Sequence, residues 1–150
     1  MRRRERGSQF VEAGLSFVPF FALLLLAADT GYGVWVKATL QHAVREGVRY
    51  GVTGQTSGGL GQGASIAAVV QNQAMGLLSS QPGTISVRYY DPASLTETNS
   101  NADGNVLEVS VENYQLTPLA PLLRSSTPAA ITVRAADIVE PPPGGAAPQP

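Results

Sequence analysis

A run of sixteen residues without a charged side chain, from Ala13 to Ala28, constrains this chain more than any other feature. As a helix the run is about 24 Å long, at about 1.5 Å per residue. Crossing the hydrocarbon core of a bilayer takes roughly 20 residues. The segment from Ser8 to Ala28 reaches that length with 21 residues, provided that Glu12 is included. We therefore predict one membrane-spanning helix.

The residues on either side of this run predict how the helix is oriented. Four arginines precede it, at positions 2, 3, 4 and 6. Tyr32 and Trp35 follow it and carry amphipathic rings that settle at a membrane–water boundary, so we expect them to be membrane-interface anchors in contact with lipid. The positive-inside rule then places the N-terminus in the cytoplasm and everything after Lys37 outside.

A secretory signal peptide cut after Ala28 is the main alternative, and it would release a secreted binding domain. Leu26 would then stand where such a cut needs a small residue, and Glu12 would interrupt the apolar region. A buried core helix is disfavoured because four consecutive leucines, 23–26, leave no polar face for water. The retained anchor is the favoured interpretation.

Glu12 lies just inside the apolar segment. A charged side chain in a spanning helix costs about 2.5–3.5 kcal/mol at the bilayer centre and less near the interface. Either Glu12 lies in the headgroup layer near the arginines, or it pairs with a cation supplied by processing or by a neighbouring subunit.

The string from Gly7 to Glu12 resembles the processing site of type IV pilin-like precursors: a glycine after a basic leader, four residues, then glutamate. The resemblance implies that a prepilin peptidase cuts between Gly7 and Ser8, which removes a leader of residues 1–7. The new α-amino group of Ser8, with a usual pKa of about 7.7–8.0, would be largely cationic and would pair with Glu12 in the assembled filament.

The residues beyond the span narrow the resemblance to TadE-like proteins, the minor pilins or pseudopilins of tight-adherence (Flp) pili. The similarity covers about Arg4 to Gly51 and includes Leu40-Gln41-x-Ala43-x-Arg45-Glu46-Gly47-x-Arg49-Tyr50. Ala13 departs from the pattern, because an aromatic residue often follows the glutamate in that family. The resemblance implies a protein of the bacterial inner membrane, with its C-terminal domain periplasmic or extracellular, that supports pilus assembly, adherence or secretion. Whether it enters the pilus stays open.

The same resemblance implies its partners: the prepilin peptidase, other pilins or pseudopilins, and the inner-membrane assembly platform. Neither nucleic acid nor a small-molecule substrate is expected. The alternative is an unprocessed single-pass envelope protein whose outer domain is a binding or scaffolding module.

An apolar stripe predicts that the helix continues past the membrane, over residues 8–52. The stripe consists of Val36, Leu40, Ala43, Gly47 and Tyr50. It packs either on the chain's own outer domain, the favoured interpretation, or on neighbouring subunits. A glycine-rich linker is expected at 53–63, where Gly59-x-Gly61-x-x-Ala64 superficially matches a dinucleotide fingerprint. That motif needs a preceding strand, and here a helix precedes it.

The remaining residues predict an α+β outer domain over 64–140. A second helix is expected over 64–79, a turn at 81–83, and three alternating strands at 84–90, 106–114 and 131–139. One-sided alternation favours a small antiparallel sheet of about three strands with one wet face, the other packed on a helix as in pilins. The proline-rich tail, 141–150, is expected to be disordered.

No pattern of catalytic or metal-binding residues is evident, so neither an enzyme nor a cofactor or metal site is expected. His42, the only histidine, has no acid–base partner nearby in the sequence and is expected on an exposed or rim position. Residues 99–105 begin like a calcium loop, but Ser110 stands where a bidentate glutamate is needed, which favours a surface loop or a hairpin turn through Asp103-Gly104. The net charge of −1 gives no support for nucleic-acid binding, and the lack of cysteine excludes disulfides.

Overall fold

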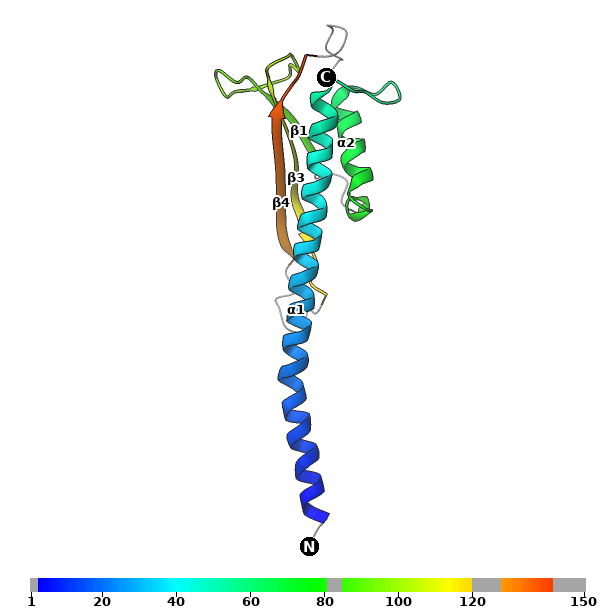
Figure 1. Cartoon of the computed structure of the whole chain (residues 1–150), viewed down its shortest axis with the longest axis vertical. Coiled ribbons are helices and arrows are strands. Elements are labelled where there is room, and N and C mark those ends of the chain that lie inside the picture. Colours follow the sequence, from blue (N-terminus) through cyan, green and yellow to red (C-terminus); the bar gives the residue numbers. More distant parts are fainter. Residues whose placement is uncertain (1–2, 81–84, 120–127, 142–150) are drawn as a thin grey trace.

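The computed structural model of the chain describes residues 3–80, 85–119 and 128–141, and the side chains of these residues except 3–8 and Ser80. The helices are α1 (Arg3–Val52), α2 (Gln62–Gln73) and a short 3₁₀ helix η1 (Leu77–Ser80). The strands are β1 (Ile85–Tyr90), β2 (Glu97–Thr98), β3 (Val106–Leu116) and β4 (Ala129–Ile138). The expected α+β class, with a long apolar N-terminal helix, a second helix and a small antiparallel sheet, is confirmed (Figure 1).

Helix α1 forms both a free rod and part of a domain. Its 50 residues correspond to about 75 Å at 1.5 Å per residue, and it continues through Pro19. In Figure 1 its first half extends alone, while the sheet and α2 lie along its second half. The predicted stripe packs on the chain's own domain, since Val36, Leu40 and Ala43 are fully buried in the core that the sheet and α2 complete.

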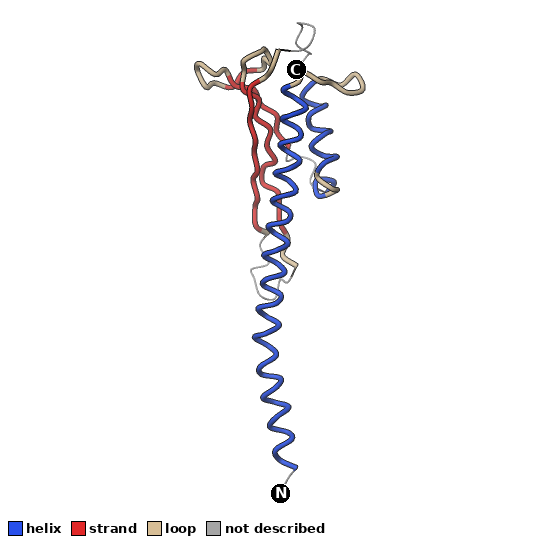
Figure 2. Tube along the Cα trace, in the orientation of Figure 1, coloured by secondary structure: helices blue, strands red, loops and turns tan. Residues whose placement is uncertain are grey.

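The sheet has the strand order β2-β1-β3-β4, and all neighbours pair antiparallel. Helix α1 packs on β3 and β4, and α2 packs on β1. Figure 2 shows the two layers, with the strands beside the helices. Three of the strands lie where alternation predicted them; the two-residue strand β2 was not expected and adds a fourth. The other sheet face carries an ion pair of 3.2 Å between Arg88 and Glu112, and it also exposes Ile138.

A β-bulge in β3 changes which residues face the core. Leu107, Val109 and Val111 are buried at odd-numbered positions, whereas the inward residues after the bulge, Tyr114 and Leu116, are even-numbered. The register shifts between Val111 and Tyr114, where Asn113 has a φ of 55°. The extra residue lets one long strand keep apolar side chains on the core at both ends.

The second helix differs from its predicted range of 64–79. It begins at Gln62, inside the expected linker, and ends at Gln73. Met75 and Gly76 then have φ values of 51° and 81°, a left-handed backbone that cannot continue the helix. The chain resumes as η1, which still buries Leu78. The predicted turn at 81–83 and residues 142–150 of the proline-rich tail lie outside the described residues.

A buried glutamine joins four parts of the domain. The Nε2 of Gln62 donates to the Gly51 carbonyl at the end of α1 (2.8 Å). Its Oε1 accepts hydrogen bonds from the Tyr89 hydroxyl of β1 (3.1 Å) and from Nδ2 of Asn101 in the loop before β3 (2.5 Å). Because Gln62 is almost fully buried, these bonds satisfy polar groups that water does not reach.

Candidate functional site

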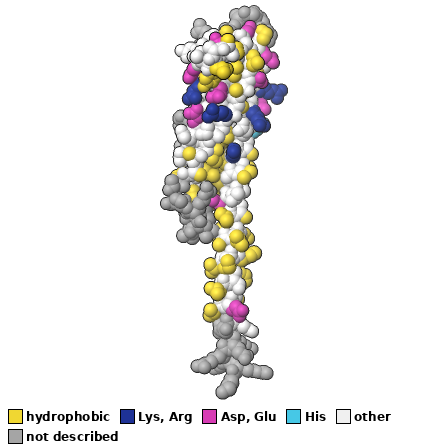
Figure 3. All heavy atoms as spheres, turned by 90° about the vertical axis from the view of Figure 1, so that its left-hand side faces the viewer, with side chains coloured by type: hydrophobic (Ala, Val, Ile, Leu, Met, Phe, Trp, Pro, Cys, Tyr) yellow, Lys and Arg dark blue, Asp and Glu magenta, His cyan; other side chains and the backbone are white. Residues whose placement is uncertain are grey.

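The first half of α1 exposes an apolar surface. Its large side chains from Phe10 to Leu26 are exposed, and Figure 3 shows apolar side chains along this part while charged side chains gather on the domain. By length and composition α1 can cross a membrane. These observations are consistent with a single-pass membrane protein.

Two hydroxyl groups on this part of α1 form hydrogen bonds within the helix. Ser16 Oγ donates to the Glu12 carbonyl (3.0 Å), and Thr30 Oγ1 donates to the Leu26 carbonyl (2.8 Å). Both hydroxyls are therefore satisfied within the helix, which a bilayer core requires. Phe17, Phe20 and Phe21 form a cluster with neighbouring ring centroids 5.8–6.2 Å apart.

The predicted processing residues lie at the N-terminal end of this helix. Gly7 and Ser8 are helical, and Glu12 follows Ser8 by four residues, one turn or about 6 Å along the axis. The Glu12 side chain is exposed, and among residues with described side chains no cation lies within ion-pair distance. The cut after Gly7 and the pairing of Glu12 stay predictions.

The two predicted interface anchors lie at the other end of the apolar segment. The rings of Tyr32 and Trp35 stack with centroids 5.9 Å apart. Tyr32 packs against the domain core, whereas the side chain of Trp35 is 46% exposed. Tyr114 lies on β3. Its pKa is raised by burial and, to a smaller extent, by the charge of Tyr32.

Asp29 is a boundary residue whose role the sequence did not indicate. It is the first charged residue after the apolar run, yet it is only 6% exposed. Its Oδ1 accepts a hydrogen bond of 2.7 Å from the backbone N–H of Leu119, which follows β3. The two residues are 90 positions apart in the sequence. The contact therefore becomes visible only when the sheet is packed against α1.

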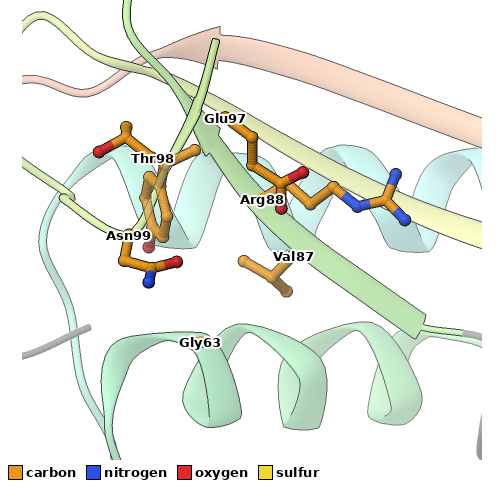
Figure 4. A pocket seen from close by; sticks show the side chains of 7 residues that line it. Gly63, Val87, Arg88, Glu97, Thr98 and Asn99 are labelled. Carbon is orange, nitrogen blue, oxygen red and sulfur yellow. The ribbon is translucent and has the colours of Figure 1, made fainter.

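The domain has a hollow of about 390 Å³ between the start of α2 and strands β1 and β2. Figure 4 shows Gly63 on the helix side, with Arg88, Glu97 and Asn99 across from it. A hydrogen bond to Tyr90 and the nearby Glu112 carboxylate raise the pKa of Arg88, which stays a cation. Besides Gly63, Val87 and Tyr89, the hollow is lined by the polar side chains of Arg88, Glu97, Thr98 and Asn99.

Other candidate sites from the sequence are placed by the structure as follows. His42 is exposed on α1, as expected. Asn101, within the calcium-like string, is buried and donates to Gln62, and Gly104 has a φ of 86° in a turn before β3. This turn lies in a surface loop and joins no adjacent pair of strands, since β1 lies between β2 and β3. Among the described residues no cluster of potential ligands could hold a metal ion.

Residues 7–49 match the family model described as TadE-like protein. The match covers Gly7, Glu12, the apolar segment and most of the helical part that packs on the sheet, and it confirms the resemblance noted in the sequence. No curated protein and no solved structure matches the chain.

Proposed function

We propose that this chain, whose residues 7–49 match the TadE-like family, is a minor pilin or pseudopilin that supports assembly of a tight-adherence (Flp) type IV pilus. It is anchored in the bacterial inner membrane with its N-terminus in the cytoplasm. Its role is structural, in adherence or secretion, and it catalyses no reaction.

The observation that carries the proposal is the pairing of an exposed apolar rod with a domain on one unbroken helix. Residues 10–26 expose their apolar side chains, and from Val36 onward the same helix contributes buried side chains to the core of the domain. A signal peptide would not need this continuity. A subunit that moves from the bilayer into a filament needs a continuous helix, because the helix is the part that packs in both environments.

Glu12 supports the assembly role by its chemistry. A carboxylate in hydrocarbon is unfavourable alone, and so is an amine, but the pair is tolerated when the geometry is good. Cleavage after Gly7 would create that amine at Ser8. Pairing between subunits would then also fix their register along the filament.

The first test is mass spectrometry of the protein extracted from membranes. An N-terminus at Ser8 supports the proposal. An intact arginine-rich start indicates an unprocessed envelope protein, and a start near Asp29 indicates a secreted domain.

A second test uses Gly7→Leu, which blocks a peptidase that requires glycine before the cut. We expect the full-length precursor to accumulate in the membrane fraction and to be absent from filaments. Gly14→Leu is the control, since nothing lies within 4 Å of a Cβ added there. Normal trimming of Gly7→Leu would refute the peptidase assignment.

A further inference from the structure

We propose that the segment after β3, at Leu119, forms a second contact with the bilayer and rests in its headgroup layer. This contact would set the height of the outer domain above the membrane. The proposal depends on the membrane insertion proposed above, and its partner is the lipid surface itself.

The first argument is one of height along α1. The exposed apolar residues from Phe10 to Ala28 span about 28 Å at 1.5 Å per residue, close to the roughly 30 Å of a hydrocarbon core. Headgroups add about 5–7 Å on each side. Asp29 therefore lies where the hydrocarbon ends, and the headgroup layer covers about the next four residues of the helix.

The second argument is the hydrogen bond that holds Leu119 at this height. Its backbone N–H donates to Asp29 Oδ1 at 2.7 Å, so the two residues lie at the same level. Asp29 keeps its carboxylate buried against the domain rather than in hydrocarbon. The Leu119 side chain, in contrast, is 60% exposed. An exposed leucine at that level contacts lipid rather than bulk water.

The third argument is that exposed apolar side chains continue on the uncovered side of α1 just beyond this level. Gly33 and Val36 face the sheet, because a Cβ on Gly33 would lie 3.2 Å from Leu116 and Val36 is fully buried. Val34 and Trp35 lie on the uncovered side and are 65% and 46% exposed. Leu119 supplies the apolar group on the sheet side. In Figure 1 this end of the sheet is the one nearest the free half of α1.

The chain offers a direct test because Trp35 is its only tryptophan. In full-length Trp35→Phe, a single reporter is placed by Leu119→Trp, by Phe20→Trp in the span, or by Leu60→Trp. Leu60 is the matched control: an exposed leucine in the loop between α1 and α2, at the far end of the domain. Each protein is reconstituted into phosphatidylcholine–phosphatidylglycerol vesicles that carry a nitroxide quencher in the headgroup or deep in the acyl chain.

We expect the tryptophan at 119 to emit at shorter wavelength than that at 60, and to be quenched mainly by the headgroup probe. The tryptophan at 20 should be quenched by the deep probe, and that at 60 by neither. The second contact would be refuted if the tryptophan at 119 had the same emission wavelength and quenching as the one at 60 while the tryptophan at 20 was quenched. The membrane anchor would then still stand. If 20 is not quenched, the proposed insertion fails as well.

A further variant tests the hydrogen bond. Asp29→Ala, added to the Leu119→Trp protein, removes the acceptor that holds the segment against α1. Headgroup quenching at 119 should fall toward the value at 60. Unchanged quenching would refute the role of Asp29 in setting the height.

Discussion

Under the proposed function, Glu12 is the residue at which insertion and assembly make opposite demands. Glu12→Ala removes a group that costs up to about 2.5–3.5 kcal/mol in a bilayer, so we expect membrane insertion to be unchanged or improved. If Glu12 pairs with the Ser8 amine as proposed, its loss should reduce incorporation into filaments. Cell fractionation measures the first quantity and the subunit content of sheared filaments the second.

Glu46→Ala is the control for this prediction. Glu46 is an acidic residue on the same helix, beyond the membrane segment, so its loss should change neither quantity. Filaments with a normal content of the Glu12→Ala protein would contradict the paired-charge mechanism.

Gln62 holds the buried polar network of the domain. Gln62→Leu leaves the Gly51 carbonyl and the Tyr89 hydroxyl without this partner. Each buried polar group left unsatisfied costs about 1–3 kcal/mol, so we expect the free energy of unfolding to fall by about 2–4 kcal/mol. Denaturant titration of the detergent-solubilised chain measures it. Gln73→Leu, at an exposed position of the same helix, should have little effect, and equal losses in both variants would argue against the network.

Tyr89 makes the free energy of unfolding depend on pH in the alkaline range. Burial raises the pKa of its hydroxyl above the usual value of about 10. The folded state thus favours the neutral phenol. This contribution is complete below about pH 10 and is lost as the pH rises through the raised pKa. We expect unfolding free energy to fall above pH 10, and to fall less steeply in Tyr89→Phe, with Tyr114 supplying the remaining slope. An unchanged slope would contradict this origin.

At the scale of elements, two glycines on α1 permit close packing. A Cβ on Gly47 would collide with Val70 of α2, and one on Gly51 would collide with Leu107 and lie 2.7 Å from Ile66. Overpacking a core costs about 1–3 kcal/mol, so we expect Gly47→Ala and Gly51→Ala each to lower the free energy of unfolding by that amount.

Gly31→Ala on α1 and Gly63→Ala on α2 are matched controls, because nothing lies within 4 Å of a Cβ at either position. Alanine in a helix interior is favoured over glycine by about 0.5–1 kcal/mol, so these variants should be neutral or slightly stabilised. Denaturant midpoints in detergent give the comparison. Destabilisation of all four variants alike would show that helix packing is not the cause.

The elements differ in how far the sequence could predict them. Helix α1 and the strands around Val87, Val109 and Val133 follow from periodicity, which is local. The early end of α2 depends on Met75 in a left-handed conformation, and the bulge depends on how β3 aligns with β4. Neither leaves a periodic signal.

The same distinction applies to the candidate site. The string from Gly7 to Glu12 and the rings of Tyr32 and Trp35 are local features and were predicted. The bonds from Asp29 to Leu119 and from Gln62 to Asn101 were not, because each joins segments that only the folded chain brings together.

At the scale of the whole molecule, α1 leaves no hinge between its apolar half and the domain. The helix is unbroken from Arg3 to Val52, and its end is tied to the chain's last described segment by a hydrogen bond from the Glu140 N–H to the Val52 carbonyl (3.1 Å). Any rotation or shift of the apolar half of α1 therefore moves the domain with it. In the proposed function, this rigidity would transmit the position of the helix in the bilayer, or in a filament, directly to the outer surface of the domain.

This architecture predicts which truncated fragments of the chain can fold. A boundary after the helix, near residue 53, would remove a third of the core. Among the described residues, six of the eighteen buried apolar side chains belong to α1: Val36, Leu40, Ala43, Val44, Val48 and Val52. The partners that they cover on α2 and β3, such as Ile66 and Leu107, would face water. Exposing apolar surface to water costs about 25 cal/mol for each Å². A domain this small buries too little other surface to offset that loss of stability.

We therefore expect a fragment of residues 29–150, which retains the Asp29 contact, to be soluble and to unfold cooperatively on heating. A fragment of residues 53–150 should show neither a near-ultraviolet circular dichroism signal nor a cooperative transition. The two fragments differ only in whether they contain the second half of α1, so thermal melts compare that part alone. Cooperative unfolding of the shorter fragment at the same temperature would show that α1 is a tether outside the domain, and the rigid transmission from membrane to outer surface would then be lost.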